Sequence, residues 1–224
     1  AGDDPSIGAS LGDARETALR VAVDATLIAV VLGLWIALLV TRRPRTASER
    51  RLLGGIDAIF VLPLGVSAVT LGFGFLIALN RPPLDFRDSA MLVPLAQALV
   101  ALPLVVRTLT PVLRGIDERM REAATSLGAN PRQVLTTIDL PRVSRPLVAA
   151  AGFAFAVSMG EFGATSFVAR ADSPTLPLLI YRLIGRPGEG HLAMAAAAAV
   201  VLALVIMVVV VVSDRSHERG VAQW

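Results

Sequence analysis

Few residues in this 224-residue chain could carry chemistry on their own. The chain contains no cysteine, which excludes disulfides, zinc–thiolate sites and thiol catalysis. Its two histidines, His191 and His217, lie far apart in the sequence and make a poor metal set. No GxxxxGK(S/T) loop is present to bind nucleotide phosphates. A membrane-embedded enzyme needs a convergent nucleophile, base or metal set, so the sequence disfavours that class.

Asp57, Arg107 and Glu161 are charged residues that could lie deep within apolar runs, whereas Asp24 lies near the entrance of its run. An ionisable residue in such a run is a functional candidate by default, because lipid makes an isolated charge costly. Arg107 lies near the end of its run, where an arginine can snorkel to the interface. Glu161, between Gly160 and Gly163, has two open interpretations. It either fixes packing near the outer interface, for example by pairing with Arg107, or lies on a translocation path or outer gate.

The composition predicts an all-α integral membrane protein. Hydrophobic residues make up 54% of the chain, and the mean hydropathy is +0.67. Several apolar runs are continuous rather than alternating, which favours helices over a barrel. All 21 basic residues are arginines. Many of them occur in loops beside apolar runs, which is the position of basic residues that determine membrane orientation. We therefore expect no nucleic-acid partner, despite a pI of 10.8.

We expect about five transmembrane helices. The candidate spans are residues 19–40, 54–79, 90–113, 146–169 and 191–213. Within the second span, Pro63 predicts a kink and several glycines predict close helix packing. Residues 1–18 are expected to form an extracytoplasmic segment, and residues 214–224 a cytoplasmic tail. No internal repeat or soluble second domain is evident.

The distribution of arginine predicts the orientation. Residues 41–51 carry five arginines and one glutamate, and residues 114–145 carry six arginines and four acids. Residues 80–89 are charge-balanced, and the N-terminal segment is acidic. The positive-inside rule places the two arginine-rich loops in the cytoplasm and the N-terminus outside. Five spans then place the C-terminus in the cytoplasm.

The longest charged interval, Asp117 to Pro146, has the pattern of two short amphipathic helices. Apolar residues fall at helical spacing, first at Ile116, Met120, Ala123, Ala124 and Leu127, then at Val134, Leu135 and Ile138. Gly128 is a natural stop, and Asn130 and Pro131 are typical of an N-cap and a first helical position. Pro141 and Pro146 are expected to end the second helix. On periodicity alone, a solvated connector between spans fits equally well.

The spacing within this interval is more specific. It reads Glu122-Ala123-Ala124, three residues, Gly128, nine residues, Ile138, one residue, then Leu140-Pro141. This resembles, position for position, the EAA loop signature of the membrane subunits of bacterial ABC importers. With apolar spans on both sides, the chain resembles the type I importer permease, or MetI-like, core.

The resemblance implies a non-catalytic permease whose loop is a coupling helix docked on a separate ATPase subunit, where ATP and Mg bind. Closure of the ATPase dimer would switch the spans between inward- and outward-facing states. In that role Ala123 and Ala124 allow close approach, Gly128 permits the turn, and Glu122 can pair with a basic group on the partner. The resemblance also implies an extracytoplasmic substrate-binding protein, a second permease copy or half, and a bacterial inner membrane.

A second stretch, residues 160–183, reads GEFGATSFVARADSPTLPLLIYRL. It resembles permeases for iron(III), thiamine, molybdate and sulfate, and the iron(III)/thiamine branch in particular. Iron(III) or thiamine is therefore the expected cargo, ahead of molybdate or sulfate. Many such permeases are double-length, so we expect this chain to be one half. Thr175, Leu176, Pro177 and Tyr181 should lie outside, on an ordinary surface helix or on a seat for the binding protein.

The alternative function is a secondary transporter or channel module without ATPase coupling. Such a protein should direct more polar and charged residues toward a midplane site. The EAA-type spacing has no reason to exist there. The importer permease is therefore the leading hypothesis.

Overall fold

The computed structural model describes residues 5–41, 46–61, 65–81, 84–85, 89–169 and 174–221. Within these ranges the chain is almost entirely helical, which confirms the all-α prediction. The exception is a two-residue antiparallel pairing of β1 (Asn80–Arg81) with β2 (Leu84–Asp85).

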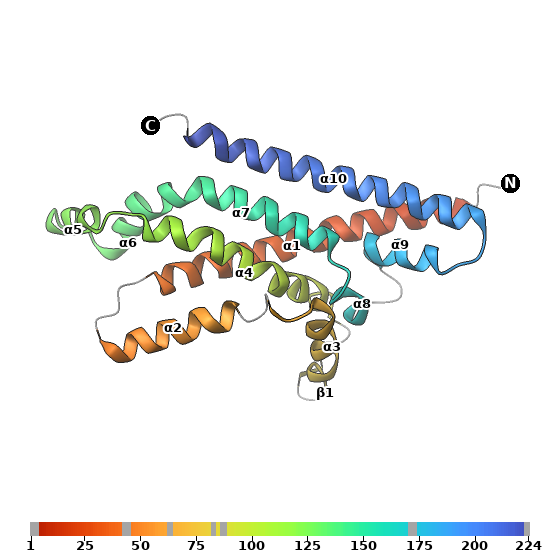
Figure 1. The fold of residues 1–224 in the computed structure, drawn as a ribbon, viewed down its shortest axis with the longest axis horizontal. Helices are drawn as coiled ribbons and strands as arrows, with labels where there is room; N and C mark the ends of the chain where they lie inside the picture. The colour runs from red at the N-terminus through yellow and green to blue at the C-terminus, as the bar shows by residue number, and fades with distance from the viewer. Residues whose placement is uncertain are drawn as a thin grey trace.

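Four long helices lie along the long axis of the molecule. They are α1 (Pro5–Val40), α4 (Leu92–Arg114), α7 (Leu140–Gly160) and α10 (Glu189–Val221). Figure 1 shows α1, α4 and α10 running in one direction and α7 in the other. Within the described ranges, four helical stretches are long and apolar enough to cross a membrane: Gly12–Val40, Leu92–Arg114, Pro131–Gly160 and Glu189–Ser213. The spans predicted over residues 19–40, 90–113 and 191–213 are confirmed as helices.

Small residues on α1 hold the centre of the bundle together. Ala22, Ala25 and Ala29 follow one buried face of α1, which packs against α4 and α7. Gly33 on the same helix faces Val105, whose Cγ1 would lie 2.6 Å from a Cβ at Gly33. Lipid supplies no hydrophobic drive between membrane helices, so close backbone approach of this kind provides the packing energy.

Helices α7 and α10 also approach closely. A Cβ on Gly152 of α7 would overlap the hydroxyl of Ser213 on α10, and Ser213 is buried. Much of the remaining surface of α10 is exposed and apolar, including Leu204, Met207 and Val211. Such a surface is that of a helix that faces lipid on most sides.

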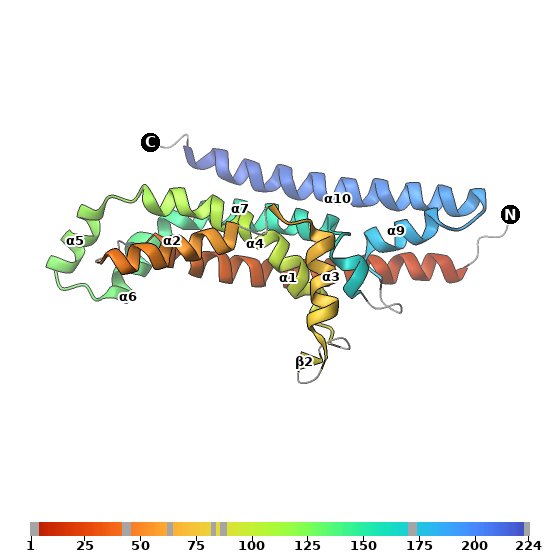
Figure 2. The ribbon, with the colours of Figure 1, turned by 60° about the horizontal axis from the view of Figure 1, so that its bottom comes forward.

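The prediction of one helix over residues 54–79 is wrong. The run is divided between α2 (Ala47–Val61) and α3 (Ala68–Ala78). With 11 residues, α3 is about 16 Å long, too short to cross a hydrocarbon core of about 30 Å. Figures 1 and 2 both show α3 pointing away from the bundle. Proline and glycine disfavour helix continuation, and Pro63 and Gly65 occur where the run divides, although Pro63 and the Asp57 side chain lie outside the described residues.

The predicted span over residues 146–169 is displaced toward the N-terminus. Continuous helix runs from Pro131 to Gly160, and a turn then leads to α8 (Thr165–Val168) and α9 (Leu176–Ile184). Two polar segments are also more helical than expected. Helix α1 already begins at Pro5, and α10 continues to Val221.

The segments that connect the long helices lie at the two ends of the bundle. At one end lie α5 (Glu118–Ser126) and α6 (Pro131–Val134), while α9 and the N-terminus lie at the other (Figure 1). The end of α1 and the start of α2, which includes part of the arginine-rich segment of residues 41–51, also lie toward the α5–α6 end.

Candidate functional site

The loop between α4 and α7 is built from capped helices. The Asp117 carboxylate caps α5 by accepting a hydrogen bond from the backbone N–H of Arg119 at 3.0 Å. Asn130 caps α6 through its side chain, which accepts from the Gln133 N–H at 2.9 Å. The Gln133 side chain accepts from the Asn130 N–H at 2.8 Å in return, completing a capping box. The predicted helix pair and its Asn130 cap are confirmed.

Gly128 forms the turn between α5 and α6. Its φ is +89°, a left-handed conformation that strains any residue with a Cβ. The Gly128 N–H donates to the Thr125 carbonyl at 2.9 Å, and the Ala129 N–H donates to the Ala124 carbonyl at 3.0 Å. Nothing lies within 4 Å of the position of a Cβ on Gly128. Glycine is therefore needed here for backbone geometry rather than for space.

The second helix does not end at Pro141 or Pro146, contrary to the prediction. It passes from α6 through a π-helical turn, η2 (Leu135–Asp139), directly into α7. A π turn widens the hydrogen-bond register by one residue. This accommodates Pro141, which has no N–H, in the first turn of α7. Helix α6 of the loop and the membrane helix α7 are thus parts of one continuous helix.

An ion-pair cluster fixes α5 to this continuous helix. The Arg121 guanidinium donates through Nε to Asp139 Oδ1 at 2.9 Å, and its Nη2 lies 2.8 Å from the same oxygen. Nη1 donates to Glu118 Oε2 at 2.9 Å. Partial burial of Arg121 lowers its pKa, but the hydrogen bonds and charges of Asp139 and Glu118 outweigh burial and hold that pKa above its ordinary value. No motif in the sequence indicates this cluster, because Arg121 and Asp139 lie 18 residues apart on separate helices.

The residues of the EAA-type signature divide between an outward and an inward face. Glu122, Ala123, Gly128 and Pro141 are exposed. Ala124 and Leu140 are half-buried, and Ile138 is buried in the main apolar cluster. The loop therefore presents an acid, a small residue and a glycine turn to its surroundings, while Ile138 anchors it to the bundle.

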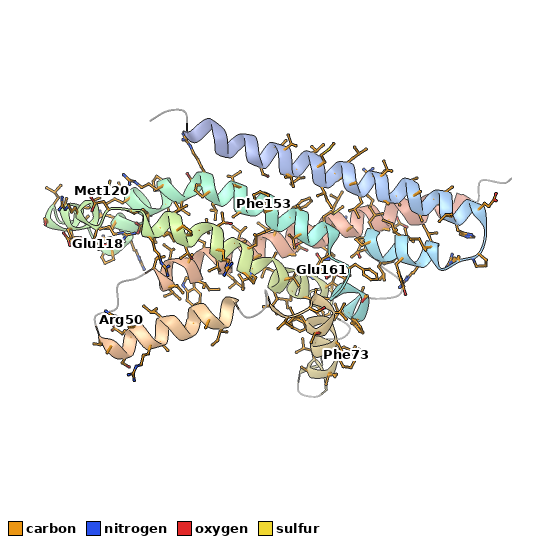
Figure 3. All side chains as sticks on the ribbon, viewed as in Figure 1. Arg50, Phe73, Glu118, Met120, Phe153 and Glu161 are labelled. Atoms are coloured by element: carbon orange, nitrogen blue, oxygen red, sulfur yellow. The ribbon has the colours of Figure 1, made fainter. Side chains whose placement is uncertain are left out.

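Leu127, beside the Gly128 turn, projects from the tip of the loop. It was predicted to lie on the apolar stripe of the first helix, but 89% of its surface is exposed. Met120, on the same helix, is also exposed, and Arg142 donates to its sulfur at 2.9 Å. An apolar side chain held in water at a rigid tip is a feature of an interaction site. Figure 3 shows Glu118 and Met120 at this end of the molecule.

The Glu161 carboxylate lies in a buried turn between α7 and α8. Only 6% of Glu161 is exposed. Its two oxygens accept hydrogen bonds from the Ala164 N–H at 2.8 Å, the Thr165 N–H at 2.9 Å and the Thr165 hydroxyl at 2.6 Å. The charge is thus satisfied by the start of α8 rather than by Arg107. Figure 3 shows Glu161 far from the loop of α5 and α6.

This network extends to α4. Gln97, which is buried, donates through Nε2 to the Thr165 hydroxyl oxygen at 3.1 Å. Thr165 donates in turn to Glu161, so three buried polar groups form one directed chain. Gln97 Oε1 has no partner among the described atoms. The contact between Gln97 and Thr165 could not be predicted from the sequence, because 68 residues separate them.

Helix α3 is packed tightly against the Glu161 turn. A Cβ on Gly72 would lie 2.5 Å from the Cα of Ala164. A Cβ on Gly163 would lie 3.1 Å from the Cβ of Ala68 and 3.3 Å from Glu161 Oε1. Gly160, by comparison, is exposed and has only ordinary contact distances around it. Gly163, rather than Gly160, is therefore the sterically demanding neighbour of Glu161.

Residues 175–181 offer a smaller surface to an external partner than the sequence predicts. Thr175, Leu176 and Pro177 are buried at the start of α9. Tyr181 is 62% exposed and packs at one edge on Phe162, with ring centroids 5.1 Å apart. Among these four residues, only Tyr181 can present a large surface to a partner.

Long apolar helices joined by a capped polar loop define a helical membrane protein. The family described as "Binding-protein-dependent transport system inner membrane component" matches residues 29–222. The chain belongs to this family and is a membrane permease subunit of an ABC importer, a class that works with an ATPase and a substrate-binding protein. A structure of the MetNI methionine ABC transporter in inward-facing conformations shares the fold, with a TM-score of 0.76 over 97% of this chain and 99% of that chain, at 19% identity.

Named relatives differ from the expected cargo branch. The molybdenum transport system permease protein ModB of Haemophilus influenzae is 34% identical over 184 residues, covering 76% of this chain and 78% of that protein. ModB of Escherichia coli K12 is 33% identical over the same length. The putative 2-aminoethylphosphonate permease PhnU of Salmonella typhimurium is 33% identical over 178 residues, but the match covers only 61% of that protein. These relatives lend no support to the iron(III)/thiamine branch.

Proposed function

We propose that this chain forms the translocation pathway of an importer for a small tetrahedral oxyanion, such as molybdate or a phosphonate. The cargo proposal rests on the relatives of 33–34% identity that are named as a molybdenum permease and a putative 2-aminoethylphosphonate permease. Molybdenum in aerated water is an oxyanion, and a phosphonate group has the same tetrahedral shape and negative charge. Iron(III) and thiamine, suggested by residues 160–183, are the competing cargoes.

The loop from Asp117 to Pro146 is the element that couples transport to the ATPase. The observation that carries this proposal is the rigid α5–α6 pair, clamped by Arg121 and tipped by exposed Leu127. A clamped helix transmits a push, whereas a flexible connector absorbs it. Glu122 and Ala123 lie on the docking face, where the acid can pair with a basic group of the ATPase and the alanine permits close approach.

The continuous helix Pro131–Gly160 connects the docking loop with the Glu161 turn. A displacement of α6 by the closing ATPase dimer moves the far end of α7, where Gly160, Glu161 and Gly163 lie. We assign this turn to the gate of the pathway. The Glu161 hydrogen bonds hold α8 in one orientation, so movement of α7 either carries α8 along or breaks them.

The complete transporter contains more than this chain. The chain itself binds no cofactor and carries no catalytic group, since ATP and Mg belong to the ATPase. A second copy, or a second permease half, completes the pathway in a bacterial inner membrane. The loop of α5 and α6 faces the cytoplasm with the C-terminus, while the N-terminus, α9 and Tyr181 face the substrate-binding protein outside.

Uptake by the complete complex tests this proposal. The permease, its ATPase and its binding protein are reconstituted in proteoliposomes and offered molybdate, a phosphonate, iron(III) and thiamine. We expect ATP-dependent uptake of an oxyanion. Uptake of iron(III) or thiamine alone would overturn the cargo, and uptake without ATP hydrolysis would instead identify a secondary transporter or channel.

Coupling is tested with Gly128→Asp, which should abolish uptake or ATPase association while the protein still inserts in the membrane. Gly12→Asp is the matched control, because Gly12 is equally open but lies toward the opposite end. Unchanged uptake and ATPase association in Gly128→Asp would contradict the coupling assignment.

A further inference from the structure

Arg107 is a charged residue that the coupling loop and the Glu161 turn leave unexplained. It lies within α4, seven residues before the end of this helix at Arg114. Its side chain is exposed, and no ion pair or hydrogen bond to it occurs among the described side chains. The Glu161 carboxylate, a possible partner, is bound instead by the start of α8. Arg107 is therefore an uncompensated positive charge on a membrane helix.

The exposed face of α4 is a narrow stripe. Arg107, Pro111 and Arg114 are exposed at spacings of four and three residues, so they lie on one side of the helix. The neighbouring Val105, Val106 and Leu109 are buried. Figure 1 shows α4 crossing the centre of the bundle beside α1 and α7, against which it packs. A central helix thus turns one charged stripe away from its own bundle.

The backbone is also polar at this point. Pro111 stands four residues after Arg107 inside α4 and has no N–H. The carbonyl of Arg107 therefore lacks its normal intrahelical donor. In membrane proteins, freed backbone groups and unpaired charges are tolerated where they line a water-filled cavity or a path. The exposed charge of Arg107 and its freed carbonyl therefore lie at the same turn of α4, where water can satisfy both.

Snorkelling is the alternative explanation for Arg107. It lies about 10 Å from the end of α4, measured along the helix axis. An arginine can cover part of that distance and bind a lipid phosphate. A lipid headgroup and a tetrahedral oxyanion offer the same chemistry, because both present phosphate-like oxygens to the guanidinium fork.

We propose that Arg107 lies on the translocation path and contacts the oxyanion in transit. This proposal rests on the oxyanion cargo proposed above. A planar guanidinium donates hydrogen bonds to two oxygens of a tetrahedral anion at once. A neutral or cationic cargo offers no such pair of anionic oxygens. A single arginine at a hydrated site binds such an anion weakly enough to release it. Arg107 thereby selects the charge of the cargo after the binding protein has delivered it.

Substitution in the reconstituted complex tests the role of Arg107. Arg107→Gln should lower molybdate or phosphonate uptake per ATP hydrolysed roughly tenfold, the loss expected for one charged hydrogen bond. Arg107→Lys should retain most of the uptake, since the charge remains. Arg20→Gln is the control, because Arg20 is an exposed arginine on another long helix.

Accessibility of residue 107 to water-soluble reagents distinguishes a position on the translocation path from a position facing lipid. The 224 residues contain no cysteine, so Arg107→Cys introduces a single thiol into this chain. A charged, membrane-impermeant thiol reagent should label this variant and should not label Leu204→Cys on the exposed face of α10. Labelling only by a lipid-soluble reagent, or an Arg107→Gln defect that depends on phosphatidylglycerol in the vesicles, would assign Arg107 to a headgroup and overturn the proposal.

The two proposals fail in different ways. A wild-type complex that imports no oxyanion overturns the proposed function and, with it, the role of Arg107. A wild-type complex that imports the oxyanion, with Arg107→Gln equally active, overturns only the role of Arg107. Loss of assembly with the ATPase in both Arg107→Gln and Arg107→Lys would show a structural role and would also overturn it.

Discussion

Arg121 and Asp139 are 18 residues apart in the chain, yet their side chains meet, with Nη2 of the arginine 2.8 Å from Oδ1 of the aspartate. The pair joins the surface helix α5 to the π turn that leads into α7. Glu118 completes the cluster from within α5. Each member is partly shielded from water, so the cluster is worth more than an exposed surface pair.

Asp139→Asn should loosen α5 without unfolding the membrane helices. The change removes the charge that Arg121 faces and retains the shape of the side chain. We expect a local cost of about 1–3 kcal/mol, seen as roughly tenfold faster amide exchange in α5. Uptake should fall while the ATPase remains bound. Arg119→Gln, an exposed neighbour, is the control, and equal exchange in the two variants would rule out the clamp.

Leu127→Ala should weaken binding of the ATPase. Leu127 is 89% exposed in the free chain, so its contribution appears only on docking. Burying a leucine side chain is worth about 1.5–3 kcal/mol, so truncation should weaken binding roughly tenfold. Co-purification or a titration in detergent measures this. Leu192→Ala on α10 removes another exposed leucine, 62% exposed, and should have no effect, and equal affinity of both variants would contradict Leu127 docking.

Glu161→Gln should destabilise the turn between α7 and α8. The two oxygens of the carboxylate accept three hydrogen bonds. The amide of glutamine replaces one of these oxygens with an NH₂ group, which cannot accept from the donors that faced that oxygen. We expect a cost of about 1–3 kcal/mol and an apparent Tm lowered by several degrees. Glu189→Gln, at an exposed position, should keep the wild-type Tm. A Tm equal to that of wild type would show that Glu161 does not hold α8.

Gly72→Ala should disrupt the packing of α3 against α8. The new Cβ would lie 2.5 Å from the Cα of Ala164, and backbone cannot move aside as a side-chain tip can. Phe73 and Phe167, which pack edge to face 5.8 Å apart, should lose this geometry. Gly74→Ala meets nothing within 4 Å and should be neutral or slightly stabilising. Limited proteolysis near α3 distinguishes the two variants, and equal resistance would refute the close packing.

The features predicted well from sequence are those that depend on near neighbours. The Asn130 cap, Pro131 at the first helical position and the Gly128 stop each follow from a few adjacent residues, and the structure has all three. The long apolar runs also predicted helices, because a bilayer of fixed thickness demands them.

The features predicted poorly depend on contacts across the fold. Pro141 was expected to end a helix, but the preceding π turn accommodates it and the helix continues. Leu127 fits an apolar stripe by spacing, yet the bundle ends before reaching it. Glu161 was recognised as an ionisable residue within an apolar run, whereas its link through Thr165 to Gln97 required knowledge of which helices meet.

The contact of Gly152 with Ser213 makes α10 sensitive to the membrane around it. The apolar part of α10, Glu189–Ser213, has 25 residues and is about 37 Å long, several ångströms more than a typical hydrocarbon core. Such hydrophobic mismatch is relieved by tilting. Because Ser213 is held against Gly152, and Ala198 is buried in one cluster with Met159 of α7, α10 is fixed to α7 near both ends of its apolar part, so the thickness of the host bilayer sets the tilt of the two helices together.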